Sequence, residues 1–155
     1  MEQLFINFGA EIITLHILSA VIWVGGMIAV RFAVHQVIHS ITPENVRVEK
    51  ALNVMKNLFF LVLPFIFILV VTGIIMIYGL GHKGDMGVHI KEGLWTLMFL
   101  NFAVMFFRRK KAEQLSKENL EEAKKQMMII SKFMLPANII FGITAIYMGG
   151  VLRGF

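Results

Sequence analysis

The stretch LFFLVLPFIFILVVTGIIMIYGL, Leu58 to Leu80, decides the fold of this chain. It contains no charged residue over 23 positions. A helix rises about 1.5 Å per residue, so this segment is long enough to cross the roughly 30 Å hydrocarbon layer of a bilayer. The segment therefore predicts a transmembrane helix, in which every backbone polar group is satisfied without water.

Three further apolar segments accompany it. Residues 133–152 are also free of charge, and residues 12–30 are uncharged when His16 is neutral. Residues 93–107 span only about 22 Å as a helix, so that helix must draw its first turn from the polar residues before it. The chain is 57% hydrophobic, which is more than a soluble domain carries. We expect an all-α integral membrane four-helix bundle, a single transmembrane domain over residues 1–155, with helices at about 12–34, 58–80, 88–108 and 130–152.

The basic residues predict the orientation of the bundle. Twelve of the fifteen Lys and Arg follow the first or the third predicted helix, and only Lys83, Lys91 and Arg153 fall on the other side. Because Lys and Arg accumulate in cytoplasmic loops, both termini are expected outside, in a multi-pass protein of a bacterial inner membrane. Topology thus accounts for the net charge of +5, and we expect membrane lipid and no nucleic acid as a partner.

A polar stripe runs along the first predicted helix. His16, Ser19, Trp23 and Gly26 recur every three or four residues and therefore share one helix face. Small residues beside a histidine leave room next to its ring, and they equally let two helix backbones approach closely in lipid. Close approach accounts for Ser19 and Gly26, but it gives no reason for a histidine in an apolar segment.

Two more polar residues, His89 and Lys91, open the third predicted helix on the same outer side. A charged group near the bilayer centre costs roughly 2.5–3.5 kcal/mol on insertion scales, so such residues usually serve a function. Two histidines on separate helices suit a b-type haem, because neutral imidazole binds the iron axially. We therefore predict His16 as an axial ligand, with Trp23 and Gly26 lining the cofactor.

The second axial position has three candidates. It is His89, it is Lys91, or it is left for substrate or oxygen. Lys91 is also the predicted catalytic residue, as a cation that pairs with anionic groups of a substrate or carries a proton. A lysine at this depth also has a simpler interpretation, in which its ammonium group reaches up to the membrane interface.

Two other patterns favour metals less clearly. Arg31, His35 and His39 form a row at one end of the first helix, which suits either a metal site or a face that binds lipid head groups. The chain contains 11 methionines, whose thioethers suit Cu(I), but they are scattered without an M-x-x-M cluster. Cysteine is absent, which excludes disulfides and thiolate ligands.

A sequence repeat connects the second and fourth helices. LPFIFILVVTG and LPANIIFGITA each begin with Leu-Pro, and each carries a threonine eight residues after the proline, Thr72 and Thr144. If the match reflects structure, the chain is a parallel repeat of two helix pairs.

Over nearly its whole length the chain resembles the superfamily that contains the HemJ protoporphyrinogen IX oxidases and the CopD copper-resistance membrane proteins. LHILSAVIWVGGMIAVRFAVHQ, residues 15–36, is similar to the first helix of that group, with His16, Trp23 and Gly26 at matching intervals. VHIKEGLWTLMFLNFAVMFFRR, residues 88–109, resembles its third helix, with an H-x-K start at His89 and Lys91.

The resemblance implies four helices and a haem b, and it associates His16 and Lys91 with haem binding and activity. It suggests oxidation of protoporphyrinogen IX to protoporphyrin IX, with electrons passing to a membrane acceptor. One alternative is CopD-like copper transport or resistance, which the Gly25-Gly26 pair and Asn101 favour. Another is a non-catalytic cytochrome b subunit. A homodimer is a further expectation, because four short helices leave little room to enclose a haem.

Overall fold

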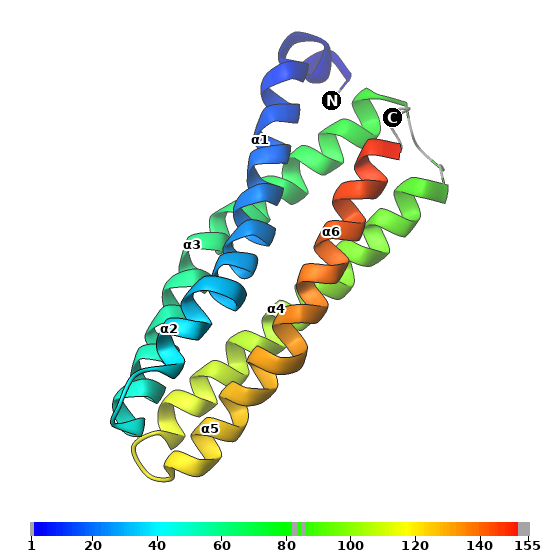
Figure 1. The fold of residues 1–155 in the computed structure, drawn as a ribbon. Coiled ribbons are helices and arrows are strands. Elements are labelled where there is room, and N and C mark those ends of the chain that lie inside the picture. The colour runs from blue at the N-terminus through cyan, green and yellow to red at the C-terminus, as the bar shows by residue number, and fades with distance from the viewer. Residues whose placement is uncertain (1, 82–83, 85, 152–155) are drawn as a thin grey trace.

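The computed structural model describes residues 2–81, 84 and 86–151, and over these residues the chain forms four long helices (Figure 1). All four are long and apolar enough to cross a membrane, which agrees with the predicted all-α class. The predictions for Lys83 and Arg153, and for the end of the last helix at Leu152, lie outside the described residues. The elements in chain order are α1 (Glu2–Ala29), a π-helical turn (Val30–Val34), α2 (His35–His39), α3 (Glu44–Gly79), α4 (Met86–Leu115), α5 (Leu120–Ile129), a second π-helical turn (Ile130–Met134) and α6 (Leu135–Val151).

The helices continue well beyond the predicted boundaries at the end of the bundle that holds residues 40–43 and 116–119, called here the basic end. The second helix begins at Glu44 rather than near residue 58, and the third ends at Leu115 rather than near 108. The predicted bounds followed the apolar run, whereas the helices go on as amphipathic segments. Val48, Leu52, Ala112 and Ala123 form a second, smaller core that holds these extensions together.

The first helix also starts earlier than predicted, at Glu2. A kink at Phe8, with φ −130° and ψ 28°, turns its first residues across the end of α3. Phe5 of this turn packs directly on Gly79, where a Cβ atom would collide with the ring. The N-terminal turn is thus held to α3 by close contact at a glycine.

The four long helices are arranged at the corners of a square, so that each one contacts two neighbours. α1 lies along α3, α3 contacts α4, α4 lies along α6, and α6 contacts α1, so that α1 and α4 are diagonal (Figure 1). Trp23 of α1 meets Phe102 of α4 across this diagonal, edge to face at 6.1 Å between ring centroids. Both termini of the described chain lie at the end opposite the basic end (Figure 1).

The main core is apolar and lies in the middle of the bundle. Its largest side chains are Trp23 and Phe59, each 1% exposed. Many large apolar side chains point outward instead, including Phe67 at 70% and Phe133 at 68% exposed. A soluble protein rarely exposes such a surface, and a lipid-facing helix bundle requires it.

A π-helical turn lies directly before α6 and its Pro136. The Leu135 N–H donates to the carbonyl of Ile130 five residues earlier. Pro136 itself has no backbone N–H and cannot donate to the preceding turn. The other π-helical turn, at Val30–Val34, contains no proline.

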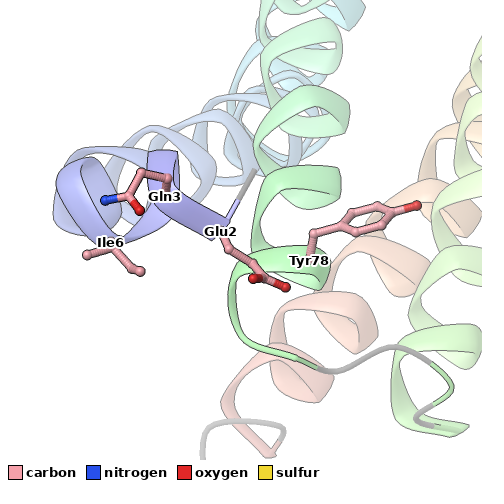
Figure 2. Close-up of a pocket in the computed structure, with 4 residues that line it drawn as sticks. All are labelled: Glu2, Gln3, Ile6 and Tyr78. Atoms are coloured by element: carbon pink, nitrogen blue, oxygen red, sulfur yellow. The ribbon is translucent and has the colours of Figure 1, made fainter.

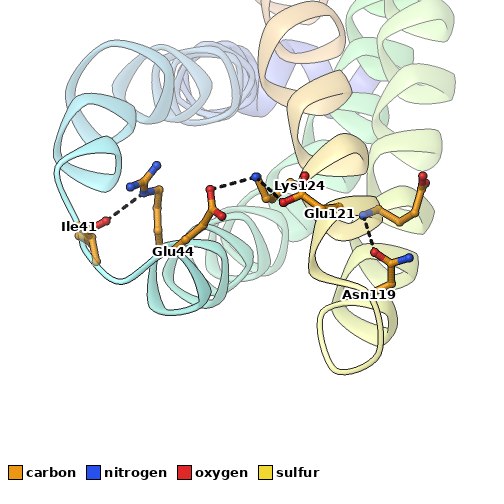
Figure 3. A network of polar contacts seen from close by, with 7 residues as sticks. Ile41, Glu44, Asn119, Glu121 and Lys124 are labelled. Carbon is orange, nitrogen blue, oxygen red and sulfur yellow. Dashed lines mark hydrogen bonds and ion pairs between the residues drawn. The ribbon is translucent and has the colours of Figure 1, made fainter.

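Polar contacts tie the helix extensions together at the basic end (Figure 3). Lys124 of α5 pairs with Glu44 of α3 at 3.0 Å and with Glu121 at 2.9 Å. Asn119 caps α5 by accepting a hydrogen bond from the Glu122 N–H at 3.2 Å. Exposed ion pairs contribute only about 0–1 kcal/mol each, so the small core carries most of the stability there.

Candidate functional site

His16 is the best-defined polar site in the membrane part of the described chain. It is partly buried on α1 and its Nδ1 lies 2.9 Å from Oγ1 of Thr72 on α3. Its ring also lies against Gly73, where a Cβ atom would stand 3.4 Å from the ring Cε1. Two adjacent residues of α3 therefore fix the ring, one by hydrogen bonding and one by offering a flat backbone surface.

The hydrogen bonds of Thr72 define the tautomer of His16. The Thr72 hydroxyl donates its one proton to the Ile68 carbonyl at 2.7 Å, with the Leu69 carbonyl also near at 3.2 Å. Toward His16 the hydroxyl oxygen must then accept, so the imidazole proton lies on Nδ1. The lone pair is left on Nε2, which is the arrangement that a metal-ligating histidine adopts.

His89 occupies a different environment from His16. Its side chain is 60% exposed, and its Nδ1 lies 3.2 Å from Oε2 of Glu92 one turn later on α4. α4 is diagonal to α1 in the bundle, whereas His16 lies against α3. The predicted second axial ligand therefore lies on an outer face of the bundle and is paired within its own helix.

Lys91 points the other way from His89. Residues two apart on a helix differ in direction by about 200°, so the two side chains leave α4 on opposite faces. Lys91 is partly buried, and its Nζ would stand 3.1 Å from a Cβ atom at Gly149 of α6. The ammonium group thus lies between α4 and α6, beside a glycine that makes room for it.

Trp23 and Gly26, the predicted lining residues, both face the interior. Gly26 receives Leu58 of α3, whose Cδ1 would lie 3.0 Å from a Cβ atom there, so this glycine serves close packing of α1 on α3. Trp23 is buried, and its indole N–H finds no hydrogen-bond partner among the described residues; the same holds for Trp95. An unpaired buried N–H costs about 1–3 kcal/mol, which an acceptor on a bound molecule would recover.

Sequence reasoning missed Asn138, which is fully buried in α6. Its amide donates to the Met98 carbonyl at 3.2 Å, and its Oδ1 accepts from Asn101 of α4 at 2.7 Å. Asn101 also donates to the Met134 carbonyl at 2.8 Å. An amide inside the otherwise apolar run 133–152 is the signal that would have found this network.

Arg109 is buried, although it belongs to the basic run that follows the third apolar segment. It is 4% exposed and follows Phe102 and Met105 along the core-facing stripe of α4. Its Nη2 donates to Glu113 at 2.9 Å, whereas Nε and Nη1 have no partner among the described residues. The spacing of three to four residues from the core positions is the signal that predicts its burial.

The histidine row at the basic end brings two imidazole rings together. His35 and His39 lie close together, with ring centroids 4.4 Å apart. Within the part of the chain that the structure describes, no group of three His, Cys, Asp or Glu side chains is arranged to hold a metal ion. Among the described residues, His35 and His39 are therefore a pair of possible ligands rather than part of a larger cluster.

A surface hollow of about 470 Å³ lies at the terminal end, lined by Glu2, Gln3, Ile6 and Tyr78. Figure 2 shows Glu2 on the side of the N-terminal turn nearer to Tyr78 of α3. The hollow is open and contains neither His16 nor Lys91. It is distinct from the histidine site.

The donor chemistry fits a haem at one axial position. A neutral imidazole with its lone pair on Nε2, held by a threonine and packed on a glycine, is a suitable iron ligand. The unpaired indole N–H groups add donors in the bundle interior. His89 does not complete a bis-histidine pair with His16 in this arrangement, because it faces outward and pairs with Glu92.

Fold and site together define a bundle of four potential membrane-spanning helices with a threonine-oriented histidine between the first two. Comparison with known proteins finds no matching family model, curated protein or solved structure. The function is therefore argued from the residues alone.

Proposed function

We propose that this chain is a haem b-binding oxidoreductase of the bacterial inner membrane, similar to HemJ, that oxidises protoporphyrinogen IX to protoporphyrin IX. The observation that carries the proposal is the contact of His16 Nδ1 with Thr72 Oγ1 at 2.9 Å, from which we assign the tautomer required of an axial ligand. A histidine inside a membrane carries a free-energy penalty of insertion, so such a residue usually serves a function.

In the proposed orientation the basic end lies in the cytoplasm and both termini lie outside. The positive charges support this, because twelve of the fifteen Lys and Arg belong to the basic end or to the helix segments leading to it. His16 and Lys91 then lie in the outer half of the membrane.

When bound, the haem would carry the electrons that leave the substrate. Among the chain's own residues, His16 would ligate the haem iron, and the contact with Thr72 would keep its ring in place. Lys91 is the proposed catalytic residue. Its ammonium group lies between α4 and α6, and an ammonium group can pair with a propionate or carry away a proton.

The first experiment is the reduced-minus-oxidised absorption spectrum of the protein purified in mild detergent, with pyridine haemochrome quantitation. We expect a b-type spectrum that His16→Ala abolishes. His39→Ala is the matched control, because that histidine lies exposed at the basic end and should leave the spectrum unchanged. A well-folded wild type purified without haem after haem-supplemented expression would overturn the proposal.

Activity separates the enzyme from a non-catalytic cytochrome b subunit. Lys91→Met should retain the haem spectrum but lose protoporphyrinogen oxidation by at least about 100-fold, the scale of a lost acid–base group. Haem binding without oxidation in the wild type, in membranes that contain the native acceptor, would favour the subunit instead.

One observation favours copper as a second candidate. Met27, Met55, Met98 and Met105, which are scattered in the sequence, all belong to the same buried core. Thioethers suit Cu(I), so a CopD-like role in copper passage is the alternative. It predicts copper bound by the purified protein, lost in Met98→Leu and Met105→Leu, and no haem spectrum.

A further inference from the structure

A groove of about 340 Å³ lies between α4 and α5, near the basic end and away from His16. Val104, Phe107, Arg108 and Lys111 line one side of it, and Gln126 of α5 lines the other. The α4 residues follow one another at intervals of three, one and three, so they form a single stripe on the helix. Along that stripe the lining changes from apolar to cationic where the apolar run 93–107 ends.

The cations of this groove are not neutralised within the described chain. Neither Arg108 nor Lys111 forms an ion pair with any described carboxylate, whereas Arg109, Lys124 and Lys125 nearby all pair with glutamates. Arg108 Nη1 donates to Gln126 Oε1 at 2.7 Å, which holds the guanidinium across the groove. This bond uses one of five guanidinium donors, so the group retains N–H donors for an anion.

The apolar half of the groove continues toward the membrane centre. Leu97, Leu100, Val104 and Phe107 recur at intervals of three or four on α4 and are 47–67% exposed. In a bilayer this strip meets acyl chains, and Arg108 and Lys111 follow it at the level where head-group phosphates lie. The groove therefore has an apolar wall followed by a cationic end, in the same order as the acyl chain and the phosphate of a phospholipid.

We propose that this groove binds an anionic phospholipid, with its phosphate against Arg108 and Lys111 and one acyl chain along Val104 and Phe107. Inorganic phosphate would contact only the cationic end and leave the apolar wall exposed, whereas a phospholipid would contact both. The proposed occupant is therefore the lipid rather than a free anion. The proposal does not depend on haem binding. It makes the α4–α5 junction a point at which the bilayer composition acts on the bundle.

The test is native mass spectrometry of the intact protein with phosphatidylglycerol or phosphatidylcholine of identical acyl chains. We expect phosphatidylglycerol to bind more tightly than phosphatidylcholine. The double variant Arg108→Gln/Lys111→Gln should weaken phosphatidylglycerol binding about 25-fold, because two basic residues near anionic lipid each contribute about a factor of five. Lys110→Gln/Lys117→Gln is the control, since it removes the same charge from exposed positions that do not line the groove.

A charge-preserving variant and a competition with inorganic phosphate complete the test. The charge-preserving variant Arg108→Lys/Lys111→Arg should retain selectivity for phosphatidylglycerol, which separates charge from folding. Inorganic phosphate at millimolar concentration should not displace the lipid. Equal binding of the two lipids, equal weakening in both double variants, or displacement by phosphate would each overturn the proposal.

Discussion

At the scale of single residues, Thr72 and Thr144 differ in whether their hydroxyl groups contact another helix. The His16–Thr72 contact crosses two helices, and its direction follows from the threonine's own bonds to α3. Thr144, which the sequence repeat pairs with Thr72, is exposed and donates only to Ile140 of its own helix at 2.9 Å. The repeat visible in the sequence is therefore not a repeat of the site.

Thr72→Val should weaken haem binding by about 10–100-fold, the usual cost of losing a hydrogen bond to a metal-ligating histidine. Valine keeps the shape of threonine but cannot accept from His16 Nδ1. Haem retention during dialysis against apomyoglobin measures the effect, with Thr144→Val as the matched control. Identical retention in the two variants would show that Thr72 does not position the ligand.

Asn138→Ala should destabilise the bundle by about 2 kcal/mol. The variant removes two interhelical hydrogen bonds, leaves Asn101 with one fewer partner and opens a small cavity. Thermal unfolding in detergent, followed by circular dichroism, measures the change. Asn57→Ala, at an exposed position of α3, should have little effect, and an equal loss there would argue against the network.

At the scale of the helices, glycines set how closely α6 approaches its neighbours. A Cβ atom at Gly142 would lie 2.5 Å from Val24 Cγ2 of α1 and 3.2 Å from Met98 Cε of α4. Small residues at such crossings let helices pack tightly where no hydrophobic effect drives them together. Gly25, although next to Gly26 in the sequence, has nothing within 4 Å of a Cβ position.

Gly142→Ala should therefore lower stability by about 1–3 kcal/mol through overpacking. Gly25→Ala should leave stability unchanged or raise it slightly, because alanine is the better helix former. Unfolding of both variants in the same detergent makes the comparison. A loss of stability in Gly25→Ala as large as in Gly142→Ala would contradict the packing of α6 against α1 and α4.

At the scale of the whole molecule, the four long helices return both ends of the described chain to one end of the bundle (Figure 1). The basic end is held together by its own small core. An even number of crossings and the strong bias of positive charge predict which end lies in the cytoplasm. The chain has no cysteine, so introduced thiols report on topology without background.

Met86→Cys, 72% exposed at the start of α4, should react with a membrane-impermeant maleimide in intact spheroplasts. Lys117→Cys, in the turn at the basic end, should react only after permeabilisation. The inverse pattern would reverse the proposed orientation and place His16 and Lys91 in the inner half of the membrane. Labelling of unfolded protein in denaturant confirms that both thiols are reactive.

The sequence by itself determined the all-α class, the number of long helices and their approximate centres, because a charge-free run of about 20 residues has few alternatives to a helix in lipid. It also identified His16 as an anomaly, because a polar residue inside an apolar run, which is costly to place in a membrane, can be recognised from the sequence alone. The tertiary structure decided which residues meet: Thr72 beside His16, Gly149 beside Lys91, and His89 turned outward. It also buried Arg109 and Asn138 and extended the helices at the basic end. These features depend on packing between segments distant in the chain, and helical periodicity specifies a face without specifying its neighbour.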